Sequence, residues 1–94
     1  MLGVEMEIPA TVDILGISYE VVTEEMEDSE DGCISPRRQR ITLREGMCED
    51  KRAQVYLHEL VHGILDQLGY LELYEEERLV QGLAIGLHQA LKSS

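Results

Sequence analysis

The stretch DKRAQVYLHELVHGILDQL, residues 50–68, decides the fold of this chain. Its apolar residues recur at intervals of three, four and seven, which predicts one long helix with a single apolar face. These residues are Ala53, Leu57, Leu60, Val61, Ile64, Leu65 and Leu68. Asp50 is the expected N-cap, and Gly69 is expected to end the helix in a left-handed conformation. After a connector over residues 70–73, a second helix is expected over residues 74–91.

The residues before the first helix favour β-strands. Residues 11–22 are rich in β-branched side chains, and Gly16 is expected to form a bend or a bulge among them. Two further short strands are expected at residues 33–34 and 40–44, where apolar and polar side chains alternate. We therefore expect a small N-terminal antiparallel β-sheet.

The change of pattern near residue 48 divides the chain into two halves. Residues 1–47 favour strands and turns, and residues 48–94 favour two helices that pack together. This predicts an α+β fold and a single domain over residues 1–94. A chain of this length buries only about 60–65% of the surface that it exposes when unfolded, so a bound metal would help to stabilise it.

The composition restricts the partners and the compartment. Nineteen acidic residues against eight basic ones give a net charge of −11, which repels phosphate backbones and argues against a nucleic-acid partner. No apolar run reaches the roughly 20 residues that cross a membrane. Residues 1–8 contain two glutamates and no basic residue, unlike a secretory signal, and Cys33 and Cys48 form no CxxC pair. We expect a cytoplasmic protein with reduced thiols and no membrane partner.

The first helix contains the motif His-Glu-x-x-His, in which His58 and His62 are four residues apart. Residues with this spacing lie on the same helix face, so the two imidazoles can bind one zinc ion. Glu59 points about 100° away from them and suits a general base that acts on a metal-activated water. The motif therefore predicts a zinc site that lacks one further protein ligand.

The acidic start of the second helix supplies the candidates for that ligand. Glu76 and Glu77 follow His62 by 14 and 15 residues, and an antiparallel second helix returns alongside the first. Glu77 shares a helix face with Gln81, which favours it, whereas Glu76 shares one with Val80 and remains a competitor.

With these residues, the chain resembles the ImmA/IrrE-type metallopeptidases, in particular the minimal versions of phages and prophages. The resemblance begins near Ile14 and is carried by residues 31–43, 56–64 and 76–84. It implies a gluzincin-like site for one Zn²⁺ ion, in which His58, His62 and Glu77 are the ligands, Glu59 is the catalytic base and Gln81 supports the ligands. Family members often have Asn or Asp where this chain has Gln81. Larger members carry further segments after the second helix, so only a shallow specificity pocket is expected here.

The motif and the resemblance together predict a zinc-dependent metallopeptidase that hydrolyses a protein or peptide substrate. The resemblance places this activity in phage or prophage regulation. The alternative is a metal-stabilised, non-catalytic module that binds a repressor or a host protein. A degenerate structural domain without metal is the third possibility.

Three side chains are candidates for stabilising an oxyanion, namely Tyr70, Tyr74 and His88, and ordinary packing is the alternative role for each. Nothing in the sequence selects among them.

Two other groups of residues have two interpretations each. Four arginines hold half of the positive charge and form either the solvated face of a hairpin or a site for an acidic peptide along an edge strand. They are Arg37, Arg38, Arg40 and Arg44. The small residues Gly82, Gly86 and Ala90 are expected to permit close approach of the two helices, with a dimer contact as the alternative. The chain is accordingly expected to be a monomer or a weak dimer.

Overall fold

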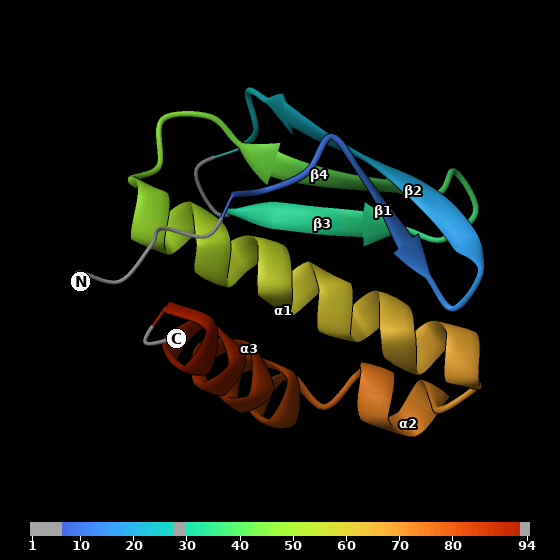
Figure 1. Ribbon diagram of the computed structural model, residues 1–94. Helices are drawn as coiled ribbons and strands as arrows, with labels where there is room; N and C mark the ends of the chain where they lie inside the picture. The colour runs from blue at the N-terminus through green and yellow to red at the C-terminus, as the bar shows by residue number, and fades with distance from the viewer. Residues whose placement is uncertain (1–6, 28–29, 93–94) are drawn as a thin grey trace.

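We describe the protein from a computed structural model, which places residues 7–27 and 30–92. The strands are β1 (Thr11–Ile14), β2 (Ile17–Glu24), β3 (Gly32–Ser35) and β4 (Arg40–Arg44). The helices are α1 (Glu49–Leu68), α2 (Leu71–Tyr74) and α3 (Glu77–Lys92). Helix α1 lies against one face of the sheet, and α3 packs on the opposite side of α1 (Figure 1). The α+β fold is thus confirmed, with the sheet first and the packed helices after it.

The sheet is mixed, so the expectation of a purely antiparallel sheet was wrong. The strand order is β1-β2-β4-β3, in which β1–β2 and β3–β4 are antiparallel whereas β2 and β4 run parallel. Three consecutive residues of β4, Ile41, Thr42 and Leu43, are buried. A strand buried on both faces takes an inner position, and the more exposed β3 becomes the edge.

The first two strands are joined by a tight turn, not by the bend or bulge expected within one strand. Leu15 and Gly16 have φ values of 49° and 92°. Positive φ at both central residues is typical of a two-residue hairpin turn whose twist matches that of the strands. The turn places Ile14 and Tyr19, each 1% exposed, in the core beneath the sheet.

Helix α1 packs tightly on the sheet. A Cβ atom added at Gly63 would lie 2.8 Å from the Cδ1 atoms of both Ile14 and Ile34, so a side chain would not fit there without displacing them. Gly69 ends the helix with φ of 82°, as predicted, and its N–H donates to the Asp66 carbonyl oxygen at 3.0 Å. The predicted Asp50 N-cap was wrong, because the helix begins at Glu49 and its N-cap is Cys48, two residues before Asp50.

Asp50 connects the two long helices instead. Lys92 Nζ lies 2.8 Å from both carboxylate oxygens of Asp50, so the end of α3 is held against the start of α1. The two helices are therefore antiparallel, as an α-hairpin requires.

The connector and the start of the second helix differ from the prediction. Residues 71–74 form the short helix α2 instead of a structureless link, and the long helix begins at Glu77 instead of Tyr74. The break falls at residues 75–76, where the Glu76 N–H donates to the carbonyl oxygen of Leu73 at 3.1 Å. This change of direction leaves Glu77 in the first turn of α3.

Helix α3 buries a narrow face. Val80, Ala84 and His88 are buried against α1. The leucines expected to pack there, Leu79, Leu83, Leu87 and Leu91, are 37–49% exposed. The predicted close approach through the small residues Gly82, Gly86 and Ala90 was wrong, since all three are exposed and a Cβ added at Gly82 or Gly86 would meet nothing within 4 Å.

Within residues 7–27 and 30–92, no helix is both long enough and apolar enough to cross a membrane. Residues 1–6, on which the prediction about a signal peptide mainly depends, lie outside the described residues.

Candidate metal centre

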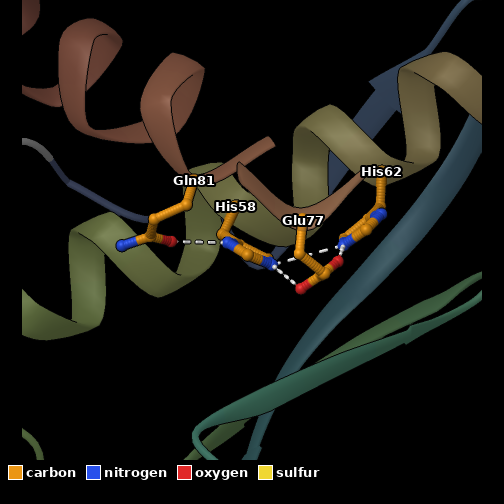
Figure 2. Close-up of polar contacts among 4 residues, drawn as sticks. All are labelled: His58, His62, Glu77 and Gln81. Carbon is orange, nitrogen blue, oxygen red and sulfur yellow. Dashed lines mark hydrogen bonds and ion pairs between the residues drawn. The ribbon is translucent and has the colours of Figure 1, made fainter. Parts of the chain in front are cut away.

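Two helices bring three metal-ligating side chains together (Figure 2). His58 and His62 lie one turn apart on α1, with their Nε2 atoms 3.2 Å from each other. Glu77, from the first turn of α3, places Oε1 2.7 Å from His62 Nε2 and Oε2 3.2 Å from His58 Nε2. The three residues predicted as ligands therefore form one group that could hold a metal ion. Glu76, the competitor, is not part of it.

Gln81 orients His58 from one turn further along α3. Its Oε1 lies 2.7 Å from His58 Nδ1. An amide oxygen only accepts hydrogen bonds, so His58 carries its proton on Nδ1 and directs the lone pair of Nε2 toward Glu77 and His62. A metal-ligating imidazole needs this tautomer.

His62 is held differently. Its ring packs on the ring of Tyr74, with centroids 4.6 Å apart and planes inclined by 54°. Its Nδ1 is buried, and no residue of the described ranges hydrogen-bonds to it. Packing against Tyr74 and the contact with Glu77 therefore fix this ring, where Gln81 fixes the other one.

Glu59 occupies the position next to the ligands and is 8% exposed. Burial raises the pKa of its carboxyl from the ordinary 4.5 to about 7, with His58 opposing the rise and Glu77 reinforcing it. A carboxyl with a pKa near neutrality both accepts and returns a proton readily, which is the property of a general base.

A cleft of about 580 Å³ runs along the group of ligands. It is bounded by β3 and the two residues before it, by the first four turns of α1, and by the end of α2 and the start of α3. Tyr74 lines it, whereas the other two candidates for oxyanion stabilisation do not. Tyr70 is 55% exposed, and His88 lies beside Asp50, with 3.7 Å between Nε2 and Oδ1.

Among residues 7–27 and 30–92, no strand pairs with the edge of β3 that faces the cleft, so this edge has backbone groups free for pairing. The Arg44 N–H donates to the Asp31 carbonyl oxygen at 2.8 Å, and in an antiparallel pair only alternate residues direct their backbone groups at the partner strand. Asp31, Cys33 and Ser35 accordingly pair with β4. The N–H and C=O groups of Gly32 and Ile34 point to the open edge. Sequence patterns carry no signal for this edge, because alternation indicates the two faces of a strand and not its neighbours in the sheet.

The arginines lie outside the cleft. Arg40 Nε is 2.6 Å from Glu20 Oε1, and Arg44 Nη2 is 2.8 Å from Asp31 Oδ1. None of the four arginines of the hairpin lines the cleft, and Arg40 and Arg44 belong to the inner strand β4. Cys33 and Cys48 are both free and exposed.

Comparisons of the chain with protein-family models, with curated proteins and with solved structures found no match. The resemblance to the ImmA/IrrE-type metallopeptidases therefore stays a prediction.

Proposed function

We propose that the protein is a zinc-dependent peptidase of the gluzincin type. The observation that carries this proposal is the convergence of His58, His62 and Glu77 beside the buried carboxyl of Glu59. Two imidazoles and one carboxylate form a ligand set of catalytic zinc sites, which keep a fourth position open.

The distances within the group fit zinc. Zinc bonds of about 2.0–2.1 Å in a tetrahedron imply ligand atoms roughly 3.3 Å apart. The two Nε2 atoms are 3.2 Å apart, and each lies 2.7–3.2 Å from a different oxygen of Glu77, so a small adjustment of the carboxylate would place one oxygen with them around an ion. The His58 tautomer set by Gln81 is also the one that zinc requires.

The chain's own residues then have distinct tasks. Bound zinc supplies the Lewis acidity that makes a water molecule acidic near neutral pH. Glu59 accepts a proton from that water as its oxygen attacks the peptide carbonyl carbon, and it delivers the proton to the departing amine nitrogen as the C–N bond breaks.

Of the three candidates for oxyanion stabilisation, Tyr74 is the best placed to stabilise the negative charge that develops on the carbonyl oxygen. It lines the cleft beside His62. Burial raises the pKa of its hydroxyl above the ordinary 10, with Asp66 adding to the rise, so the hydroxyl is a hydrogen-bond donor at neutral pH.

The open edge of β3 supports a peptide substrate. An extended peptide can add to this edge as a further strand, pairing with the backbone groups of Gly32 and Ile34. A peptide on this edge would lie in the cleft that the three candidate ligands also line.

A non-catalytic binding module is the second candidate, and the exposed leucines of α3 favour it. Residues 79–91 contain no charged side chain, although 29% of the residues in the chain are charged. Uncharged, exposed helix faces of this kind are often covered by a partner protein. For this binding module, a repressor or a host protein would be the partner.

The decisive experiment compares zinc-loaded wild type with Glu59→Gln on a library of peptides. Loss of the general base should lower the cleavage rate by about 10²–10⁴-fold while zinc binding persists. Glu72→Gln, which removes an exposed carboxylate outside the cleft, is the matched control and should cleave normally. Cleavage that survives Glu59→Gln would refute the proposed base. Full zinc occupancy without cleavage by wild type would favour the binding module.

A further inference from the structure

The cleft beside the ligands carries an excess of negative charge. In addition to Glu59 and Glu77, its lining contains three carboxylates and a single basic residue. The carboxylates are those of Glu30, Asp31 and Glu75, and the basic residue is Lys51.

These carboxylates are not equivalent. Asp31 is neutralised on both oxygens, by Arg44 at 2.8 Å and by Lys51 at 3.3 Å. Within residues 7–27 and 30–92, neither the Glu30 nor the Glu75 side chain forms an ion pair. Two carboxylates of the cleft are therefore available to a ligand.

Glu30 and Glu75 lie toward opposite ends of the cleft. Glu30 precedes β3, whose first residue, Gly32, lies against Val55 in the early part of α1. Glu75 follows Tyr74, which packs on His62 two turns further along the helix. The group of ligands lies between the two carboxylates.

The charges at the centre compensate each other once zinc is bound. The ion contributes +2, and Glu59 and Glu77 contribute −2. The uncompensated charges near a bound peptide are then those of Glu30 and Glu75, at the two ends of the cleft. The net charge of the chain, −11, has the same sign. The arginines that would attract an acidic peptide lie outside the cleft, and two of them are paired with carboxylates.

We propose that the cleft selects extended peptides that carry Lys or Arg side chains on both sides of the bond placed at the ligands. Glu30 and Glu75 are the residues that recognise these positive charges. An independent feature of the same cleft, the open edge of β3 at Gly32 and Ile34, points to an extended peptide as the ligand. This inference rests on the proposed peptidase function and specifies its substrate class.

The test measures binding with cleavage blocked. Zinc-loaded Glu59→Gln protein is titrated against three fluorescent ten-residue peptides that differ only in their flanking residues, which are Lys, Gln or Glu, and anisotropy is recorded. The substitution leaves one net positive charge at the centre, which disfavours the Lys peptide, so a preference for Lys in this protein has to come from the carboxylates of the cleft. We expect the Lys peptide to bind at least tenfold more tightly than the Glu peptide, with the Gln peptide between them. The difference should shrink when the salt concentration is raised from 50 to 500 mM.

Two double variants in the Glu59→Gln background separate local recognition from the overall charge. Glu30→Gln with Glu75→Gln should reduce the tenfold preference to less than threefold. Glu25→Gln with Glu72→Gln removes the same charge outside the cleft and should leave the preference unchanged. Equal binding of all three peptides, tighter binding of the Glu peptide, no binding at all, or an equal loss in both double variants would overturn the inference. If the Lys peptide binds selectively but wild type does not cut it, charge selection stands and the peptidase proposal fails.

Discussion

The two helices that build the metal centre are held in the fold in opposite ways. Helix α1 contacts the sheet on one side and α3 on the other, whereas α3 contacts no strand among the described residues and reaches only α1 and α2. The ligands differ accordingly. The His62 side chain is 9% exposed, and that of Glu77 is 64% exposed.

The difference shows which half of the site is preformed. On α1 the sheet holds the helix that carries both histidines, while Gln81 contacts the His58 ring and Tyr74 packs on the His62 ring. On α3 the Glu77 side chain is mostly exposed and reaches the two histidines only with its carboxylate oxygens. A metal bound to all three residues would link α3 to α1. This link would add to the packing between the two helices, which is limited because α3 buries only a narrow face.

The largest effect should come from removing a ligand on either helix. We expect His62→Ala and Glu77→Gln each to weaken zinc binding by more than about 100-fold, above the range seen when only supporting residues are lost. Glu76→Gln, one residue outside the site, should change the affinity less than threefold. Competition titration with a chromophoric chelator measures all three, and equal losses in Glu76→Gln and Glu77→Gln would disprove the assignment of Glu77.

The buried carboxyl on α1 should make the zinc-free protein sensitive to pH. Burial raises the pKa of Glu59 from 4.5 to about 7, so the folded state holds this proton more tightly than the unfolded state does. The contribution of Glu59 to the free energy of unfolding is therefore complete below pH 4.5. It decreases by about 3 kcal/mol as the pH rises to 7.

Urea unfolding of zinc-free protein between pH 5 and pH 8 measures this loss. Glu59→Gln should flatten the dependence, because an amide does not ionise in this range. Glu77→Gln should alter it less, since the exposed carboxylate of α3 only reinforces the shift. A slope that is identical in wild type and Glu59→Gln would assign the pH dependence to other groups.

The smallest expected effects are changes in stability from two glycine substitutions, one at the interface of the sheet with α1 and one on the exposed side of α3. At the interface of the sheet with α1, Gly32→Ala places a Cβ 2.6 Å from Val55 Cγ1 and 3.0 Å from the Thr42 carbonyl oxygen. Overpacking of this kind costs about 1–3 kcal/mol. On the open side of α3, Gly86→Ala meets nothing and should stabilise the helix by about 0.5–1 kcal/mol. Urea unfolding at a single pH measures both, and a destabilising Gly86→Ala would indicate that this face is covered.

Much of the site could be predicted from the sequence because it depends on local geometry. The spacing of His58 and His62 determines their common helix face, and the facing of Glu77 with Gln81 on α3 selects the carboxylate that completes the candidate group and the amide that contacts His58. Periodicity also located α1 and its end at Gly69.

The strand order and the packing of α3 depend on tertiary contacts, which local sequence patterns do not encode. The central position of β4 follows from burial on both faces, and the open edge of β3 follows from that position. The exposure of Leu79 and Leu83 follows from the packing of α3, which contacts only α1 and α2 among the described elements, because a helix packed on one side buries only part of an apolar face.

The central claim is that His58, His62 and Glu77 bind one zinc ion, and X-ray absorption at the zinc edge tests it most directly when combined with the metal content of the purified protein. We predict one equivalent of zinc bound only by nitrogen and oxygen, at about 2.0–2.2 Å, with two imidazoles among the ligands. Less than a tenth of an equivalent, or a sulfur ligand at about 2.3 Å from Cys33 or Cys48, would contradict the account.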